Sequence, residues 1–248
     1  MVTEVAAHYE ELLAQHYTWM LGPSFDALVS EQVELLDACG ARVPDGADQR
    51  ALDLGCGSGL QSVALAQLGY TNVIAIDSSP TLITELTDRA QRWPAIEPIT
   101  ADLCDGLDKI SNVTTAVCMG DTITHLPDLA ATRQLFVDVS ETLEPTGRLI
   151  LTFRDLTQPL TGLDRFIPVR SDEDRIMTCF LEDEGDAVRV HDLVHTRTDA
   201  GWQLATSSYR KLRLSPDAVA EQLRTAGFTM IRSEPGPRGM VVMTAGRA

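Results

Sequence analysis

An alternating glycine loop constrains this sequence more than any other feature. Residues 52–59, LDLGCGSG, follow a short apolar stretch and lead into a helix-like segment, residues 60–68. Glycines let a backbone turn sharply and let a ligand lie against main-chain atoms. Dinucleotide enzymes space their glycines as GxGxxG, whereas this loop reads GxGxG with Asp53 two positions before Gly55. The loop predicts a ligand site at the end of a strand.

Strand-like and helix-like segments alternate around this loop. Further strands are expected at residues 72–76, 96–101, 113–119 and 148–153, with helices at residues 80–91 and 129–143. This alternation is typical of an α/β fold with a parallel sheet covered by helices on both faces. The pattern ends with a helix that begins at Ser215-Pro216 and two strands, residues 228–231 and 240–244.

Two other segments flank this pattern. After the fifth strand, three antiparallel strands are predicted at residues 174–182, 187–198 and 202–214, with hairpin-type connectors between them. Before the glycine loop, two helices are predicted at residues 3–17 and about 24–39, the second with Ser24 as its N-cap.

Carboxylates follow the next two strands. Asp77 ends the strand VIAID, where it can accept both hydrogen bonds from a ribose diol. Alternatively, Asp77 caps the helix that begins near Pro80. Ser78 or Ser79 could cap that helix equally well. In TADL, Asp102 and Leu103 suit the exocyclic amine and the ring of an adenine. Open α/β sheets bind ligands at this carboxyl edge.

These motifs resemble the class I S-adenosylmethionine-dependent methyltransferase family. LDLGCGSG is similar to its first motif, VIAID to its second and TADL to its third. The resemblance implies a doubly wound Rossmann-like sheet of order 3-2-1-4-5-7-6 with an antiparallel last strand. It also implies S-adenosyl-L-methionine as cofactor, held by Asp53, Gly55, Cys56, Gly57, Asp77, Ser78, Asp102, Leu103, Met119 and Gly120.

The resemblance further divides the chain into three parts. Residues 1–45 form a helical lid, residues 46–156 with 214–248 form the cofactor-binding domain, and residues 157–213 form an inserted three-stranded cap. Tyr17 and Trp19 of the lid are expected to close over the cofactor, although simple packing of that helix is the alternative.

The loop after the fourth strand carries the residues expected to contact the acceptor, Asp121 and His125. As a general base, His125 would support O-methylation; as an orienting group, it would support N-methylation. Its third interpretation is a helix cap beside Pro127.

The middle strand of the inserted sheet has two distinct faces. Arg189, His191, His195 and Arg197 share one face, and Val188, Val190 and Val194 share the other, apolar face. Asp192 falls on the apolar face and needs a partner, for which Arg210 and Tyr209 are the candidates. His191 and His195 have no third ligand nearby, so no metal site is expected. Whether His191, His195 and Asp192 line the acceptor pocket is left open.

The charge and the cysteine content of the chain limit the classes of partner and the location that can be expected. The formal net charge of −16 opposes binding to nucleic acid or anionic membranes. Five scattered cysteines, no apolar membrane span and an acidic N-terminus without a signal core predict a cytoplasmic protein. The resemblance implies methyl transfer to a small-molecule amine, with O-methylation as the alternative. The inserted sheet resembles that of sugar-amine N-methyltransferases, some of which associate through it, so a homodimer is also expected. A nicotinamide oxidoreductase and a non-catalytic binding protein of the same fold are the candidates from other classes.

Overall fold

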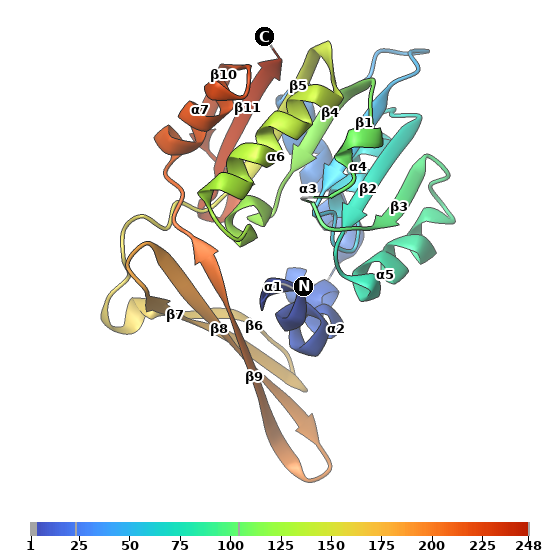
Figure 1. Ribbon diagram of the computed structural model, residues 1–248. Helices are drawn as coiled ribbons and strands as arrows, with labels where there is room; N and C mark the ends of the chain where they lie inside the picture. Colours follow the sequence, from blue (N-terminus) through green and yellow to red (C-terminus); the bar gives the residue numbers. More distant parts are fainter. Residues whose placement is uncertain (1–3, 23, 104, 248) are drawn as a thin grey trace.

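The computed structural model describes residues 4–22, 24–103 and 105–247, and a seven-stranded sheet forms its centre (Figure 1). Its strands are β1 (Arg50–Leu54), β2 (Asn72–Asp77), β3 (Ile96–Thr100), β4 (Val113–Cys118), β5 (Leu143–Phe153), β10 (Phe228–Pro235) and β11 (Val241–Arg247). Their spatial order is β10-β11-β5-β4-β1-β2-β3. Strands β1 to β5 are parallel, and β11 is antiparallel to both neighbours. The predicted order and the reversed last strand are confirmed.

Helices cover both faces of this sheet. The helices of one face are α3 (Phe25–Ala38), α4 (Leu60–Gln67) and α5 (Pro80–Ala90); those of the other are α6 (Leu129–Thr142) and α7 (Pro216–Thr225). The side chains of Ser24 and Ser215 accept hydrogen bonds from the first turns of α3 and α7, which confirms both predicted N-caps.

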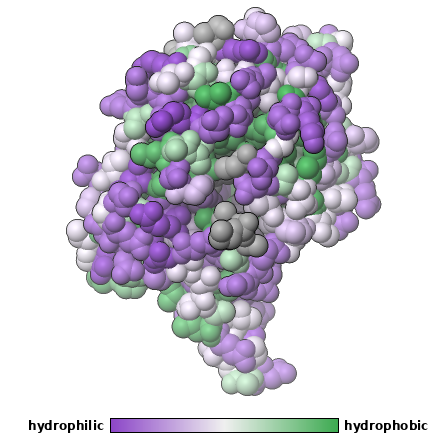
Figure 2. Space-filling view, viewed as in Figure 1, coloured by the Kyte–Doolittle hydropathy of each residue, from purple (hydrophilic) through white to green (hydrophobic). Residues whose placement is uncertain are grey.

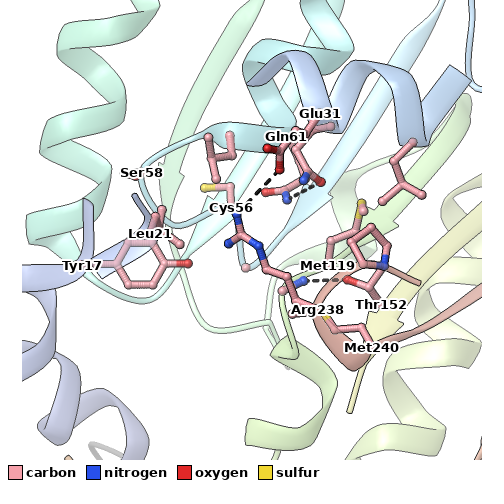
Figure 3. A pocket seen from close by; sticks show the side chains of 16 residues that line it. Tyr17, Leu21, Glu31, Cys56, Ser58, Gln61, Met119, Thr152, Arg238 and Met240 are labelled. Carbon is pink, nitrogen blue, oxygen red and sulfur yellow. Dashed lines mark hydrogen bonds and ion pairs between the residues drawn. The ribbon is translucent and has the colours of Figure 1, made fainter. Parts of the chain in front are cut away.

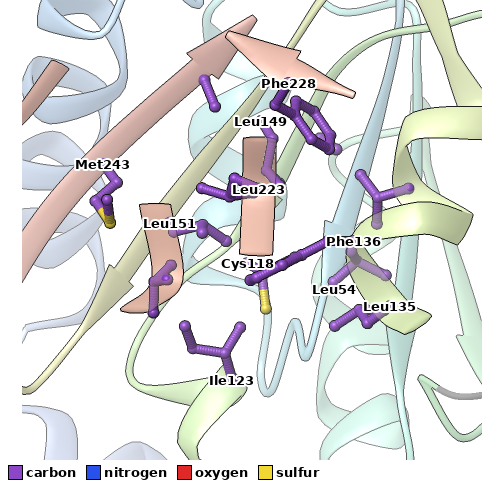
Figure 4. Packing of buried hydrophobic residues seen from close by; sticks show 14 of the residues in the cluster. Leu54, Cys118, Ile123, Leu135, Phe136, Leu149, Leu151, Leu223, Phe228 and Met243 are labelled. Atoms are coloured by element: carbon purple, nitrogen blue, oxygen red, sulfur yellow. The ribbon is translucent and has the colours of Figure 1, made fainter. Parts of the chain in front are cut away.

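The alternation of side chains along β1 builds the two layers of the core. Leu52 and Leu54 are fully buried and join the cluster beneath α6 and α7, which includes Phe136 (Figure 4). Ala51 instead joins the cluster beneath α3, α4 and α5. Asp53 has the same parity as Ala51, so its carboxyl group lies on the α4 side of the sheet.

A second, antiparallel sheet follows β5. It consists of β6 (Phe166–Ser171), β7 (Arg175–Asp183), β8 (Ala187–Thr198) and β9 (Gly201–Leu212), paired in that order. The prediction of three strands was therefore wrong by one, because β6 adds an edge strand to β7. Pro168 lies within β6. Proline has no backbone N–H group to donate, and an edge strand tolerates this loss because one of its sides has no partner strand. Proline and the lack of apolar alternation concealed this strand in the sequence.

Two predicted boundaries in the main sheet also differ. The turn at residues 145–147 lies within β5, where the pairing with β4 shifts register between Val113 and Thr115. Strand β10 continues to Pro235 past a second irregularity near Arg232. Such local irregularities add residues to a strand without changing the order of the sheet.

The N-terminal helical segment lies between the two sheets (Figure 1). It comprises α1 (Glu4–His8), one π-helical turn (Tyr9–Leu13) and α2 (Ala14–Leu21). Polar contacts anchor the segment on both sides: Glu4 pairs with Arg189 of the four-stranded sheet, and Glu10 accepts a hydrogen bond from Ser79 at the start of α5. The segment therefore covers the carboxyl edge of the seven-stranded sheet.

The surface on this side is mixed in character. Polar residues dominate Figure 2, and apolar residues recur on the projecting arm of the four-stranded sheet. The exposed large side chains of that sheet include Phe166, Ile176, Trp202 and Leu204. None of the helices in residues 4–22, 24–103 and 105–247 combines the length and apolar character that a membrane span requires.

Candidate active site

The glycine loop turns directly from β1 into α4. Gly55 has φ 71°, in the left-handed region, and a Cβ atom there would overlap the side chain of Thr122. Gly57 has φ 54°, and a Cβ atom there would lie 3.0 Å from the ring of Tyr17. These two positions require glycine because the backbone is left-handed there and because the side chains of Thr122 and Tyr17 approach it closely.

Asp77 at the end of β2 organises this loop. Its Oδ2 accepts a hydrogen bond from Gly57 N at 2.8 Å, and its Oδ1 accepts one from Ser79 N at 2.9 Å. Burial raises the pKa of the Asp77 carboxyl group above its usual value. The cap of α5 is the Ser79 hydroxyl, which accepts from Leu82 N, so Asp77 does not cap that helix.

Asp53 lies beneath the loop rather than on its surface. The residue is only 1% exposed, and Ser62 Oγ of α4 donates to its Oδ2 at 2.6 Å. Burial raises the pKa of Asp53 to about 7. The structure places this carboxyl group in the packing between β1 and α4, and it lines neither of the two cavities described below.

A cavity of about 260 Å³ opens at the carboxyl ends of β1, β2 and β3, and we call it the Asp77 cavity. Its walls bring together residues of the helical segment and of the main sheet and its loops: Val5, Tyr9, Tyr17, Gly55, Gly57, Asp77, Ser78, Leu82, Asp102, Leu103, Asp105, Gly120, Thr122, His125, Leu126 and Pro127. Most of the residues predicted to bind the cofactor thus lie around one space, with Asp102 on its exposed side.

A second cavity, the Arg238 cavity, lies on the other side of Tyr17 (Figure 3). It is lined by Tyr17, Leu21, Glu31, Gln32, Leu35, Gly55, Cys56, Ser58, Leu60, Gln61, Met119, Gly120, Thr152, Pro237, Arg238 and Met240. The predicted site residues Cys56 and Met119 belong here. Tyr17, Gly55 and Gly120 line both cavities, so the two spaces meet over the glycine loop.

Tyr17 and Trp19 have different positions, although they are neighbours on α2. Tyr17 lies over Gly57 at the junction of the two cavities. Trp19 lines neither cavity; its indole N–H donates to Asp172, and the guanidinium of Arg175 lies 4.5 Å from the ring centroid. These contacts of Trp19 hold α2 against the four-stranded sheet, and its predicted contact with the cofactor stays a prediction.

Asp121 is held by cations instead of facing an open pocket. Asp121 is 1% exposed, and Lys211 Nζ of β9 donates a hydrogen bond to its Oδ2 at 2.6 Å. Arg154 N donates to Oδ1 at 2.9 Å, and the Arg154 guanidinium lies 3.5 Å from Oδ2. Burial would raise the pKa of Asp121, but Lys211 holds it below the usual value. The carboxylate of Asp121 therefore joins the two sheets, and its predicted contact with the acceptor stays a prediction.

His125 borders the Asp77 cavity at the end of a short 3₁₀ turn, Thr122–His125. Its ring packs against Tyr209 at 5.2 Å and Tyr9 at 6.1 Å between centroids. Burial and the nearby charge of Lys211 lower the pKa of His125 to about 3. Its Nε2 atom is inaccessible to solvent and has no hydrogen-bond partner among the described residues. The imidazole is therefore neutral at pH 7, and its Nε2 makes no hydrogen bond to the described residues.

The partner of Asp192 differs from the prediction. His8 Nε2 of α1 lies 2.9 Å from Asp192 Oδ2, and Cys179 Sγ lies 2.7 Å from Oδ1. The buried carboxyl group does have partners, as the sequence requires, but Arg210 pairs instead with Glu184 and Asp186. Tyr209 stacks on His8, with 4.4 Å between ring centroids.

The two histidines on the opposite face of β8 lie away from both cavities. His191 pairs with Glu182 at 3.0 Å, and neither His191 nor His195 lines the Asp77 or the Arg238 cavity. The described residues hold no group of three or more His, Cys, Asp or Glu side chains arranged to bind a metal ion.

Several site residues were missed from the sequence. Tyr9 precedes Tyr17 by eight positions, about two helical turns, and that spacing could have identified it as a second residue on the same face. Lys211 lies 90 positions from Asp121, and Arg238 belongs to a loop without a recognisable motif. Only the folded chain brings these two cations to the site.

Comparison with known proteins agrees with this geometry. Residues 51–147 match a family model described as a methyltransferase domain. A ubiquinone biosynthesis O-methyltransferase of Xylella fastidiosa is 39% identical over 127 residues, which cover 47% of this chain and 46% of that protein. The chain spans less than half the length of the curated relatives that it matches.

The likeness to solved structures extends over the whole chain. The CcbJ methyltransferase of Streptomyces caelestis superposes with a TM-score of 0.75 at 17% identity, covering 100% of this chain and 98% of that one. A sugar N-methyltransferase of a Streptoalloteichus species gives 0.71 at 16% identity, covering 96% and 92%. Residues 51–147 are therefore similar to a methyltransferase domain, and the chain has the fold of the class I S-adenosylmethionine-dependent methyltransferases.

Proposed function

We propose that this protein transfers a methyl group from S-adenosyl-L-methionine to the nitrogen of a small-molecule acceptor. One observation carries the proposal: the glycine loop, Asp77 and His125 line the same cavity at the carboxyl edge of the sheet. That edge is where ligands bind in open α/β folds.

The residues around Asp77 fit the adenosine part of this cofactor. Each Asp77 oxygen already accepts one backbone N–H, and a carboxylate has about four acceptor positions, so two remain for the ribose diol. Leu82 and Leu103 provide apolar walls for an adenine ring, and Asp102 lies at the rim for its exocyclic amine. Ser78 and Gly57 complete the ribose side.

Methyl transfer from a sulfonium requires little from the protein beyond positioning the two reacting groups and shielding them from water. When bound, the cofactor would supply an electrophilic methyl group on a sulfonium: the N–C bond would form as the C–S bond breaks, S-adenosylhomocysteine would leave, and the methylated amine would release a proton to solvent. Tyr9 and Tyr17 of the helical segment line the cavity, where they would shield the reacting groups from water. Such positioning and desolvation account for much of the acceleration in transfer reactions.

The charges near His125 favour a neutral amine as the nucleophile. Lys211 and Arg154 lie around Asp121, and their positive charges oppose a protonated amine in the same space. A neutral amine has a free lone pair and needs no strong base. With its pKa lowered to about 3, His125 is a weak base, and its ring borders the cavity in which we place the acceptor.

Known proteins of both kinds resemble this chain. The structural neighbour from Streptoalloteichus is a sugar N-methyltransferase, and the relative from Xylella is an O-methyltransferase. The neutral His125 supports the nitrogen acceptor, and O-methylation is the alternative that the experiment below distinguishes. Association of two copies, a cytoplasmic location and the absence of nucleic-acid partners stay predictions of the sequence.

The test measures transfer of labelled methyl groups to a panel of amino sugars, aliphatic amines and phenols, for the wild-type protein and His125→Asn. We expect transfer to an amine, with the loss in His125→Asn mainly in KM. A general base for a hydroxyl would instead show a loss in kcat of roughly 10²–10⁴-fold. Thr225→Ala, an exposed change at the end of α7, is the control.

Three outcomes decide between the functions. Transfer only to phenols, with the loss in kcat, would replace the amine by a hydroxyl acceptor. Cofactor binding without turnover on any acceptor would favour a non-catalytic binding protein. Normal kinetics with a lowered melting temperature in His125→Asn would remove His125 from the site and leave a structural role.

A further inference from the structure

The helical segment of residues 4–21 packs its apolar side chains on the four-stranded sheet. The buried Leu12 of the segment lies in one cluster with Met177 of β7 and Val194 of β8. Burial of apolar surface is the dominant favourable term in folding, so separating the segment from this sheet would be costly. A second cluster joins the start of the segment to β7, β8 and β9, and its members include Val5, Leu181, Val188, Val190 and Tyr209.

A buried polar pair lies in the same contact. His8 Nε2 of α1 is 2.9 Å from Asp192 Oδ2 of β8, and the two side chains are 0% and 2% exposed. The ring of Tyr209 stacks on His8, with 4.4 Å between centroids. Because the pair is buried, water cannot replace either partner while the contact stays closed. Buried contacts of both kinds, apolar and polar, therefore fasten the segment to the four-stranded sheet.

The segment contacts the main sheet in a different way. The Glu10 carboxylate accepts a hydrogen bond from the Ser79 hydroxyl at the start of α5. The Thr18 hydroxyl donates a hydrogen bond to Glu85 of the same helix. Glu10 is exposed, and Thr18 and Glu85 are half-buried, so water can take the place of a partner and the net contribution of these bonds is small. We call this contact the Glu10–Thr18 seam.

The two cavities lie on the same side of the segment as this seam. Tyr17 lines both of them and lies over Gly57 of the glycine loop. Leu21, the last residue of α2, packs with the core beneath α3, α4 and α5 and holds the chain where it continues toward α3. Surfaces with few buried apolar contacts are the first to open in a folded protein. The segment should therefore separate from the main sheet more easily than from the four-stranded sheet.

The four-stranded sheet is attached to the main sheet at one end. The chain leaves β5 at Arg154 and returns through the end of β9, and Asp121 binds both crossings. Arg154 N donates to Asp121 Oδ1 at 2.9 Å, and Lys211 Nζ donates to Asp121 Oδ2 at 2.6 Å. Beyond this point the sheet projects away from the main sheet, with the helical segment beside it (Figure 1). Asp121 therefore lies at the position of a hinge between the two sheets.

We propose that the helical segment and the four-stranded sheet form one body that turns against the main sheet about its attachment at Asp121. This body opens along the Glu10–Thr18 seam, where the two cavities lie, and the contact between His8 and Asp192 stays closed throughout. The segment is then the end of a larger moving part and not a separate lid. The inference rests on the proposed function only for the choice of the ligand that fills the cavities.

Three distances between exposed positions test this motion. Spin labels on unnatural amino acids, which leave the native cysteines unchanged, are placed in pairs at Gln15 of the segment, Gln203 of β9 and Asp88 of α5. Pulsed electron paramagnetic resonance measures the three distances with and without S-adenosylhomocysteine. The pair at Gln15 and Gln203 lies within the proposed body, and the other two pairs join that body to the main sheet.

A variant without the seam makes the test independent of any ligand. Glu10→Ala/Thr18→Ala removes both hydrogen bonds to α5 and leaves the contact between His8 and Asp192 in place. Glu221→Ala/Thr225→Ala removes the same two kinds of side chain from an exposed part of α7 and is the matched control. Melting temperatures within the range of this control would show that the seam variant retains its fold.

In the seam variant without ligand, we expect both distances to Asp88 to shift by more than about 2 Å, the scale of a domain rearrangement. The distance between Gln15 and Gln203 should stay the same. S-adenosylhomocysteine should shift both distances to Asp88 together in the otherwise wild-type protein, because the ligand holds the body closed. The control variant should give the distances of the wild type.

Two results would overturn the inference. A shift between Gln15 and Gln203, with a constant distance from Gln203 to Asp88, would show that the segment moves alone as a separate lid. Three constant distances, in the seam variant and on addition of ligand, would show that no such body moves. If calorimetry detects no binding of S-adenosylhomocysteine to the wild type while the seam variant still shifts both distances to Asp88 together, the inference stands and the proposed function fails.

Discussion

The buried carboxyl group of Asp53 shows how one residue can make stability depend on pH. Its pKa is about 7 in the folded protein because of burial, against an ordinary value of 3.8 in an unfolded chain. The folded state therefore holds a proton that the unfolded state releases. This contribution to stability is fully present below pH 4 and is lost as the pH rises through 7.

The substitution Asp53→Asn should remove this pH dependence. Asparagine keeps a neutral polar group near Ser62 and cannot ionise. We expect the difference in unfolding free energy between the wild type and Asp53→Asn to shift in favour of the variant by roughly 1–3 kcal/mol between pH 5 and pH 8. Urea unfolding at both pH values measures this. A constant difference would show that Asp53 has an ordinary pKa in the folded state.

Asp77 gives a second prediction at the scale of one residue. Asp77→Ala removes the acceptors for the ribose and for Gly57 N–H. We expect the affinity for S-adenosylhomocysteine to fall at least about tenfold, since a hydrogen bond to a charged group contributes about 1.5–3 kcal/mol. Glu221→Ala, which removes an exposed carboxylate on α7, is the control. Unchanged affinity in Asp77→Ala would contradict the ribose assignment.

The surroundings of Asp77 could be predicted from the sequence and those of Asp121 could not, for a physical reason. Asp77 follows a strand beside the glycine loop, so its position depends on adjacent parallel strands alone. The contacts of Asp121 come from Lys211, 90 positions away in a different sheet. The same limit applied to Asp192, whose partner His8 is 184 positions away.

At the scale of elements, the helical segment of residues 4–21 forms one wall of the site. Tyr17 lies over Gly57, and both Tyr9 and Tyr17 line the Asp77 cavity. The π-helical turn at Tyr9–Leu13 lies within this wall, and such turns often occur at functional sites. We expect the segment to move when the cofactor binds or leaves.

Hydrogen exchange should detect this motion. We expect the amides of residues 4–21 to exchange more slowly after S-adenosylhomocysteine is added, because the bound ligand holds the segment closed. Peptides from α6, which packs on the far side of the sheet, should not change. Equal exchange of residues 4–21 with and without ligand would indicate a permanently packed helix.

Helices and strands with a clear sequence pattern could be predicted, and those with a weak pattern could not. Helices with polar caps, such as α3 and α7, begin where Ser24 and Ser215 indicate. Strand β6 was missed because Pro168 weakens its pattern, and only its pairing with β7 makes it a strand. Local chemistry specifies caps and turns, whereas an edge strand depends on a partner already in place.

At the scale of the whole molecule, three separate segments meet at one edge of the seven-stranded sheet. The helical segment contributes Tyr17, the main sheet contributes Asp77 and His125, and the four-stranded sheet contributes Lys211. The order of the main sheet was predicted from the resemblance of its motifs to the class I methyltransferase family, and the structure confirms it. The way in which the other two parts close over it depends on long-range packing that no motif records.

The central claim is that this edge binds S-adenosylmethionine and not a dinucleotide. Titration calorimetry of the wild-type protein with S-adenosylhomocysteine and with a nicotinamide dinucleotide tests it most directly. The arrangement of Gly55, Gly57 and Asp77 predicts saturable one-to-one binding of S-adenosylhomocysteine and no measurable heat with the dinucleotide. Binding of the dinucleotide, without binding of S-adenosylhomocysteine, would contradict the account.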